Sequence, residues 1–244
     1  MTTPTPSPID TAEECEFEIF EHTVFINLAE RTDRLEHVTA ELRKIGISNP
    51  ERFNAVRTHH GAVGCSLSHI KCLETAMHRG YPYIFICEDD ITFTNVDVFK
   101  KSLRKFCRSN YFKEFDMLMI GGNNAPPFQK TNDYCVRVSN CRTTTGYVVK
   151  QRYYSVLLQN FKEGVKHLIR EPENKQQYAI DMYWRPLQTN DRWFLLIPLT
   201  VVQRSSYSDV EEREVDYGHL MLDLEKPWLT QQVPRIHNMS YVLK

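Results

Sequence analysis

The sequence predicts an α/β protein, in which helices cover both faces of a mostly parallel central sheet. Short apolar segments rich in β-favouring residues alternate along the chain with segments of helical periodicity, which is the pattern of α/β proteins. The apolar segments are continuous rather than alternating, which indicates strands buried on both faces, as in parallel sheets. Ligands bind such sheets beyond the carboxyl ends of the strands. Polar residues that directly follow an apolar segment are therefore candidates for a site.

The first predicted elements are a strand, a loop and a helix. TVFINL (23–28) is a β-favouring segment, and apolar residues recur at helical spacing in the residues that follow it. Asp33, with Glu36 three positions later, resembles a capping box at the start of this helix, and Gly46 can supply the left-handed residue at its end. RFNAV (52–56) fits a second strand.

A second helix is predicted for GAVGCSLSHIKCLETAMHRG (61–80), which ends in glycine. Its apolar face is formed by Leu67, Ile70, Leu73 and Met77. The remaining apolar segments are predicted strands, one of them followed by a third helix: PYIFIC (82–87), FDMLMIGG (115–122), TTTGYVVK (143–150) before the helix QRYYSVLLQNF (151–161), and WFLLIPLTVV (193–202).

The composition is that of a globular protein. Its 244 residues can bury a substantial core, and 30 Lys and Arg against 31 Asp and Glu leave no basic stretch for nucleic acid or a membrane surface. The opening MTTPTPSPID lacks the apolar part of a secretory signal, and no segment approaches the roughly 18 apolar residues of a membrane span. The seven cysteines include no C-x-x-C pair, and an odd count suits reduced thiols. We expect a soluble, cytoplasmic protein with a disordered tail (1–16), one domain (17–216) and a C-terminal extension (217–244).

Three consecutive carboxylates, Glu88, Asp89 and Asp90, follow the strand predicted for residues 82–87. They repel one another unless water solvates them or a cation binds them. One interpretation is a solvated turn in which Asp90 caps the next element. The other is a site for Mg²⁺ or Mn²⁺, hard cations that one or two protein carboxylates hold together with substrate phosphates. The second interpretation requires a ligand that carries phosphate.

Two other segments offer groups for such a ligand. Arg31 and Arg34 lie in the loop and first helical turn after a strand, where guanidinium groups and a helix N-terminus favour a diphosphate, although both arginines could instead be solvated or pair with neighbouring acids. Asn27 could hydrogen-bond a base or ribose, or its own backbone. In GAVGCSLSH, Gly64 would let the backbone approach a ligand closely, whereas a structural role is the simpler interpretation of His69.

Six segments follow one another along the chain: INLAERTDR, GAVGCSLSH, CEDDITF, TTGYVV, AIDMYW and SSYSDVE. Taken in this order, they resemble glycosyltransferase family 25, which includes bacterial lipooligosaccharide galactosyltransferases and animal procollagen galactosyltransferases. The resemblance extends from Val24 to Glu211.

This resemblance implies a GT-A-type, Rossmann-like α/β/α sandwich, a UDP-sugar donor, dependence on Mn²⁺ (or Mg²⁺), and transfer with inversion of configuration. It also implies that Asp90 and Glu88 bind the metal. The residues that it assigns to donor binding are Asn27, Arg31, Arg34, Gly64, Ser68, His69, Glu88, Asp89, Thr145, Gly146 and Tyr147.

Inverting transfer also needs a base within hydrogen-bond reach of the acceptor hydroxyl. Asp181 and Asp209 match the family and are the two candidates. We favour Asp181, because its apolar neighbours would raise its pKa toward the working range, although it equally suits a helix N-cap. The chain departs from the family at Ala62, where Glu is usual. QRSSYSDVE also lacks the glycine-rich approach of the collagen-modifying members, which leaves the acceptor open.

The favoured function is therefore a metal-dependent inverting hexosyltransferase of glycan biosynthesis, moving galactose or glucose from a UDP-sugar to a hydroxyl of a glycan or glycoprotein. A metal-dependent phosphohydrolase could use the same acids, but the sequence has neither a phosphoryl-accepting Asp motif nor a clear second acid cluster. A non-catalytic nucleotide-sugar-binding module would keep Asn27 and Arg31 and lose the base or the metal. Acceptor-dependent loss of the donor distinguishes the transferase, and donor binding without turnover identifies the binding module.

Overall fold

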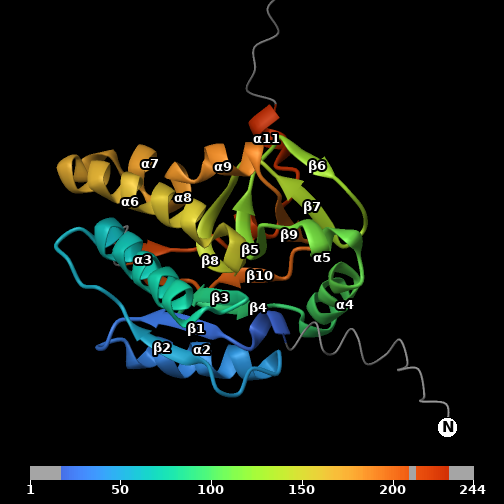
Figure 1. Ribbon diagram of the computed structural model, residues 1–244, viewed down its shortest axis with the longest axis horizontal. Coiled ribbons are helices and arrows are strands. Elements are labelled where there is room, and N and C mark those ends of the chain that lie inside the picture. Colours follow the sequence, from blue (N-terminus) through green and yellow to red (C-terminus); the bar gives the residue numbers. More distant parts are fainter. Residues whose placement is uncertain (1–17, 209–212, 231–244) are drawn as a thin grey trace, which may run out of the picture.

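The computed structural model describes residues 18–208 and 213–230, and an eight-stranded sheet forms its centre (Figure 1). The strand order is β2-β1-β3-β8-β5-β9-β7-β6, and β8 and β7 run opposite to the other strands. The fold class predicted from the sequence, an α/β/α sandwich with a mostly parallel central sheet, is confirmed. The strands of this sheet are β1 Thr23–Asn27, β2 Glu51–Asn54, β3 Tyr83–Glu88, β5 Met117–Asn124, β6 Phe128–Lys130, β7 Cys135–Val138, β8 Cys141–Lys150 and β9 Trp193–Leu196.

Two strand pairs and a set of helices complete the described chain. The pairs are β4 Ile91–Phe93 with β10 Val201–Gln203, and β11 Ser206–Ser208 with β12 Arg213–Val215. The helices are α2 Thr32–Lys44, α3 Gly61–Arg79, α4 Val96–Cys107, α5 Asn110–Glu114, α6 Tyr154–Arg170, α7 Lys175–Tyr178, α8 Ile180–Tyr183, α9 Arg185–Asn190, α10 Gly218–Met221 and α11 Pro227–Thr230, with short 3-10 turns at Gln151–Tyr153 and Pro172–Asn174.

A separate hydrophobic core lies on each face of the sheet. In β3, Ile84 and Ile86 pack into the core shared with α3 and α6, whereas Phe85 and Cys87 pack into the core shared with α2 and α4. Successive side chains of a strand point to opposite faces, so a continuous apolar strand serves both cores. Burying each such side chain stabilises the fold by about 1.5–3 kcal/mol. The two cores hold the polar ends of the strands at one edge of the sheet.

Helix α3 ends as predicted but presents a different face. Gly80 adopts the left-handed conformation (φ +68°), and Ile70 and Leu73 are buried. Met77, predicted to lie on the apolar face, is 52% exposed. The helix turns smaller residues such as Ala76, together with His69, toward the sheet and α6, which allows close packing.

The capping box predicted at Asp33 is wrong. Helix α2 begins at Thr32, with Arg31 in the N-cap position and no side-chain cap. Asp33 lies in the first turn, where a carboxylate is favourable, and its Oδ1 accepts a hydrogen bond from Nε of Arg31 at 3.0 Å. Gly46 has φ +99° just beyond the helix, as predicted.

WFLLIPLTVV forms two strands rather than the single one predicted. The chain leaves the central sheet after β9, because Pro198 has no N–H to donate to a sheet. It then forms β10, which pairs with β4 beyond the acidic segment. This second strand brings Gln203 to Glu88, where Nε2 donates to Oε2 at 3.1 Å.

Residues 217–230, the described part of the predicted C-terminal extension, pack against the body of the protein. Met221 is fully buried, and Nζ of Lys226 donates to the backbone oxygens of Asn124 and Asp223. The predicted N-terminal tail (1–16) and residues 231–244 lie outside the described residues. Within the described ranges, no helix is both long and apolar enough to cross a bilayer.

Candidate functional site

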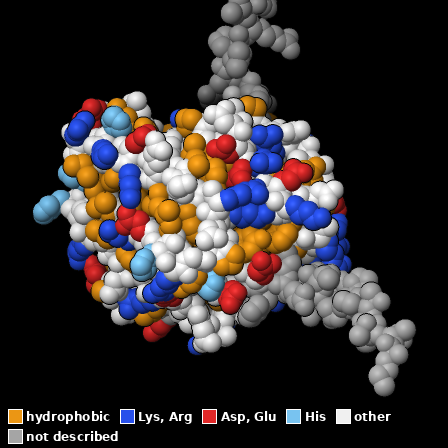
Figure 2. Space-filling view, in the orientation of Figure 1, with side chains coloured by type: hydrophobic (Ala, Val, Ile, Leu, Met, Phe, Trp, Pro, Cys, Tyr) orange, Lys and Arg blue, Asp and Glu red, His pale blue; other side chains and the backbone are white. Residues whose placement is uncertain are grey.

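A cavity of about 830 Å³ lies at the edge of the sheet where β1, β2, β3 and β5 end and β8 begins. This is the edge at which α/β sheets bind ligands, and the volume suits a sizeable small molecule. On the face seen in Figure 2, Lys and Arg are interspersed with Asp and Glu, so no single-sign field dominates that surface. The predicted residues that line the cavity are Arg31, Arg34, Gly64, Ser68, His69, Glu88, Asp89, Asp90 and Asp181.

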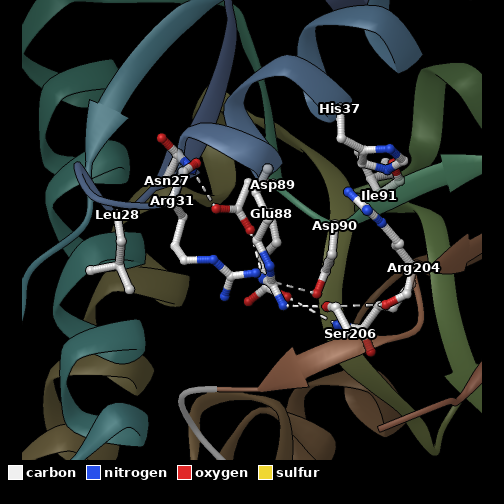
Figure 3. Close-up of polar contacts among 12 residues, drawn as sticks. Asn27, Leu28, Arg31, His37, Glu88, Asp89, Asp90, Ile91, Arg204 and Ser206 are labelled. Atoms are coloured by element: carbon white, nitrogen blue, oxygen red, sulfur yellow. Dashed lines mark hydrogen bonds and ion pairs between the residues drawn. The ribbon is translucent and has the colours of Figure 1, made fainter. Parts of the chain in front are cut away.

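Asp89 is held by hydrogen bonds from two elements. Nδ2 of Asn27, at the end of β1, donates to Asp89 Oδ2 at 2.7 Å (Figure 3). NH1 of Arg34 donates to Asp89 Oδ1 at 2.8 Å. Asn27 is buried and lies outside the cavity lining. Burial raises the pKa of Asp89, against the opposing effect of Arg34. Asn27 and Asp89 therefore fix the acidic segment to β1.

Arg34 ties the acids to a distant part of the chain. Besides Asp89, its NH1 lies 3.4 Å from Oδ2 of Asp90, and its NH2 donates to Ser206 Oγ at 2.7 Å and to the Tyr207 backbone oxygen at 2.9 Å. Desolvation of the guanidinium is outweighed by the charges of Asp90 and Asp89, so the pKa of Arg34 is raised. Arg31 pairs with its neighbour Asp33, one of the predicted alternatives, whereas Arg34 pairs with the distant acids Asp89 and Asp90.

Asp90 has one carboxylate oxygen left to bind a ligand, and its charged form is disfavoured. The residue is 9% exposed, and among the described residues its Oδ1 has no hydrogen-bond partner. Burial, followed by the charge of Glu88, raises the pKa of Asp90 to about 8. The guanidinium of Arg34 pairs with both Asp89 and Asp90, so these two carboxylates keep an excess of negative charge whenever both are ionised. Such an oxygen suits a hard divalent cation.

The raised pKa predicts that Asp90→Asn stabilises the metal-free protein at pH 8. Folded Asp90 holds its proton up to about pH 8 whereas the unfolded group loses it near its usual pKa of 3.8, so wild-type stability falls as pH rises through that window. This fall in the free energy of unfolding is at most about 1.4 kcal/mol per pH unit, and Asn, which does not titrate, removes it. We expect the free energy of unfolding of Asp90→Asn to exceed that of wild type by on the order of 2 kcal/mol at pH 8. Urea unfolding with a chelator at pH 4 and pH 8 measures it. An equal difference at both pH values would contradict the assignment.

Glu88 has a different set of partners from the other two acids. Its Oε1 accepts a hydrogen bond from Thr144 Oγ1 at 2.7 Å, and the same oxygen lies 3.6 Å from Cys65 Sγ and 3.6 Å from His69 Nε2. Burial would raise the pKa of Glu88, but its interaction with the His69 imidazole lowers it. The ligand atoms of Cys65, His69 and Glu88 lie within 4.8 Å of one another.

Thr145, Gly146 and Tyr147 lie behind the cavity wall rather than in it. The Tyr147 hydroxyl is 2.7 Å from His69 Nδ1 and so orients the imidazole. A Cβ on Gly146 would lie 2.8 Å from Cδ1 of Ile91, so a larger residue there would require the Ile91 side chain to shift. These residues support the site from the sheet.

Gly64 and Ser68 join helix α3 to the loop after β2. Ser68 Oγ accepts from the Val56 backbone N–H and donates to the Gly64 backbone oxygen, both at 2.8 Å. A Cβ on Gly64 would lie 2.4 Å from the Val56 oxygen. The small size of Gly64 therefore lets helix α3 approach the backbone of Val56, and this contact shapes the cavity wall.

Gly64→Ala is consequently expected to destabilise the protein by about 1–3 kcal/mol, because a backbone oxygen has to move to admit the methyl group. Urea unfolding measures the loss. Gly80→Ala is a poor comparison because of its positive φ, so Ala62→Ser, on the same helical turn, serves as the control. A Gly64→Ala protein as stable as wild type would contradict the packing argument.

Asp181 lines the cavity from α8. Its Oδ2 accepts a hydrogen bond from the backbone N–H of Thr143 at 3.0 Å, and Ala179, not Asp181, occupies the N-cap position of this helix. Burial, opposed by the Thr143 hydrogen bond, raises the pKa of Asp181. The other candidate base, Asp209, lies outside the described residues.

Residues 59–184, just over half of the chain, match the sequence profile of "Glycosyltransferase family 25 (LPS biosynthesis protein)". The chain belongs to glycosyltransferase family 25. The match spans α3, the acidic segment, the start of β8 and α8, so most of the cavity wall lies within the family region. A search of curated proteins found no match.

Solved structures give looser likenesses to this family 25 chain. A glycosyltransferase involved in the glycosylation of the major capsid of PBCV-1 is 10% identical, with 83% of this chain and 88% of that chain covered and a TM-score of 0.44. The Drosophila beta-1,4-galactosyltransferase 7, as a mutant in complex with manganese, UDP-Gal and xylobiose, is 12% identical, with 81% and 72% covered and a TM-score of 0.38. The family assignment rests on the profile match.

The sequence analysis missed several cavity residues of this family 25 protein. Cys65, Thr144 and Gln203 all contact Glu88. For Cys65 a signal was present: it lies four positions before His69 in a predicted helix, and residues at that spacing share a face. For Thr144 and Gln203 no local pattern indicates the contact, because both reach Glu88 from elsewhere in the sheets.

Proposed function

We propose that this glycosyltransferase is a metal-dependent, inverting hexosyltransferase that moves galactose or glucose from a UDP-sugar to a hydroxyl of a glycan or glycoprotein. The observation that carries the proposal is an oxygen of Asp90 that no described residue hydrogen-bonds, in an acid-rich cavity at the carboxyl edge of the sheet of a chain from a glycosyltransferase family. A cavity of about 830 Å³ has room for a nucleotide-sugar.

Asp90 would hold Mn²⁺ or Mg²⁺, with Glu88 or Asp89 assisting. The fit rests on the vacant Oδ1 of Asp90 and on the excess negative charge of the cluster. When bound, such an ion supplies positive charge to the departing diphosphate. Water would fill its remaining positions, as is usual for these cations.

Arg31 would bind the donor diphosphate. Its guanidinium lines the cavity, and its ion pair with Asp33 lies near the surface, where exchange for a phosphate costs little. The first turns of α3, which include Gly61 and Gly64, line the same cavity, and a helix N-terminus favours an anion. Arg34 would remain on Asp89 and Asp90 and position them.

Asp181 would act as the base. Thr143 N–H holds Oδ2, so we assign the acceptor proton to Oδ1, and a raised pKa makes the carboxylate a stronger base near neutral pH. As the acceptor oxygen attacks the anomeric carbon, its proton passes to Asp181 and the bond to the nucleoside diphosphate breaks.

The first experiment measures nucleotide release from a panel of UDP-, GDP- and CMP-sugars with Mn²⁺, Mg²⁺ or chelator. Wild type is compared with Asp90→Asn and with Asp97→Asn, an exposed acid of α4, as the matched control. Slow release from one UDP-sugar, lost with chelator and in Asp90→Asn but kept in Asp97→Asn, supports the proposal.

The other outcomes separate the alternatives. Rapid donor cleavage that no acceptor accelerates indicates a phosphohydrolase. Donor binding that calorimetry detects, without turnover on any hydroxyl acceptor, indicates a non-catalytic module. Absence of binding to every donor would overturn the proposal.

A further inference from the structure

We propose that Cys65, His69 and Glu88 form a second metal site in the cavity, one that takes Zn²⁺ through sulfur, nitrogen and oxygen. The sulfur and nitrogen ligands of this site are distinct from the hard-cation position proposed at Asp90, and zinc binding does not depend on the transferase activity. It brings together a helix and a strand end: Cys65 and His69 are four residues apart on one face of α3, and Glu88 ends β3.

Two of the three distances between the ligand atoms match the first coordination sphere of zinc. Zinc lies about 2.3 Å from sulfur, 2.0–2.1 Å from imidazole nitrogen and 2.0–2.2 Å from carboxylate oxygen in a tetrahedral arrangement, which puts neighbouring ligand atoms about 3.4–3.6 Å apart. Glu88 Oε1 lies 3.6 Å from Cys65 Sγ and 3.6 Å from His69 Nε2. All three ligand atoms lie within 4.8 Å of one another.

His69 provides an independent indication of a ligand. It is fully buried, and among the described residues Nε2 has no hydrogen-bond partner. A buried polar atom without a partner is costly. At 3.6 Å, Glu88 is too far from Nε2 for a good hydrogen bond but well placed to share an ion with it. The imidazole therefore points an unsatisfied nitrogen at the carboxylate.

The surrounding contacts orient these ligands. Nδ1 of His69 lies 2.7 Å from the Tyr147 hydroxyl, and the tautomer with the proton on Nδ1 leaves the Nε2 lone pair for a metal. Oε1 of Glu88 accepts hydrogen bonds from Thr144 Oγ1 and, at 3.6 Å, from Cys65 Sγ. Loss of the thiol proton on metal binding would free the second lone pair of this oxygen for the ion. Gln203 holds the other oxygen of Glu88.

The ligand set selects the ion. Thiolate and imidazole are the ligands of Zn²⁺ and Co²⁺, whereas Mg²⁺ and Mn²⁺ prefer oxygen alone. Cys65, His69 and Glu88 all line the cavity, so the fourth position of a tetrahedral ion would open into it. Three protein ligands with one open position is the pattern of zinc sites that bind water or a substrate group.

The test uses the full chain, stripped with chelator and titrated with Co²⁺. A thiolate-bound tetrahedral Co²⁺ shows a near-ultraviolet charge-transfer band and strong visible bands. We expect both in wild type, in Asp90→Asn, and in Cys107→Ser, which removes a thiol elsewhere in the chain. Cys65→Ser, a near-isosteric change, should lose the charge-transfer band.

Zinc content after dialysis gives a second measurement. We expect one Zn²⁺ per wild-type chain, raised thermal stability in its presence, and loss of both in Cys65→Ser and His69→Gln. Circular dichroism of the metal-free variants shows whether each is folded. If His69→Gln does not fold, the test rests on Cys65→Ser. Three outcomes would overturn the proposal: equal zinc binding by Cys65→Ser, loss of zinc in Asp90→Asn, or no stoichiometric zinc in wild type. The first of them would leave the Cys65 thiol as only a hydrogen-bond donor to Glu88.

Discussion

Asp90→Asn is expected to reduce metal-dependent turnover of the donor by at least about a hundredfold. A bound cation contributes several kcal/mol of charge stabilisation to a departing diphosphate, and each 1.4 kcal/mol is about tenfold in rate. Asp90 has a buried carboxylate oxygen with no hydrogen-bond partner among the described residues. An amide in its place is neutral and binds a hard cation poorly. Steady-state kinetics with saturating Mn²⁺ measures the loss.

Loss of the fold would not explain this result, because the same substitution is expected to stabilise the metal-free protein at pH 8. The variant should therefore be inactive and more resistant to urea at once, a pair of changes that damage to the fold does not produce. Asp97→Asn should keep wild-type turnover. If Asp90→Asn retained half of the wild-type rate with the same Mn²⁺ dependence, the metal assignment would be wrong.

Asp181→Asn is expected to lower kcat by about 10²–10⁴, the usual contribution of a well-placed base. The amide oxygen of Asn can still accept the Thr143 hydrogen bond, so the cavity wall should be preserved. Donor affinity should change little, because the proposed role concerns the acceptor proton. Kinetics with a hydroxyl acceptor, together with donor binding by calorimetry, separates the two effects.

The pH profile provides a check specific to the base. Burial raises the pKa of Asp181, so wild-type kcat/KM should rise with pH as the carboxylate ionises, with a midpoint above that of an ordinary aspartate. That acid limb should disappear in Asp181→Asn. A variant with nearly wild-type kcat and an unchanged acid limb would place the base elsewhere, with Asp209 as the next candidate.

The sequence predicted the elements that carry the site because their signals are local. The apolar run that becomes β3, the acids that end it, and the glycine that ends α3 can each be recognised within about ten residues. Two cores on opposite faces of the sheet also follow from continuous apolar strands. Helix start positions were less accurate, as at Asp33, because a side-chain cap competes with an ion pair that the sequence spacing equally allows.

Strand direction could not be predicted, and it decided which residues of β8 reach the cavity. The segment around Thr145 to Tyr147 was expected at the donor, but those residues lie deeper in the sheet, while Thr143 and Thr144 line the cavity. Gln203 was missed for a related reason: it reaches Glu88 only because the chain leaves the central sheet at Pro198. Contacts between distant segments leave no periodic trace in the sequence.

The reversed direction of β8 has a consequence for motion within the site. A strand that ran with its neighbours would reach this edge by its last residues and continue into a loop, whereas β8 starts here, paired with β5 from Cys141 and with β3 from Gly146. Thr143, whose N–H holds Asp181, lies in this first part of β8, at a break in the β5–β8 register where its φ is +69°. Its amide should exchange with solvent deuterium at rates typical of the core, and the loops around it much faster. The Asp181 carboxylate is then held in place, and the acceptor has to be positioned relative to it.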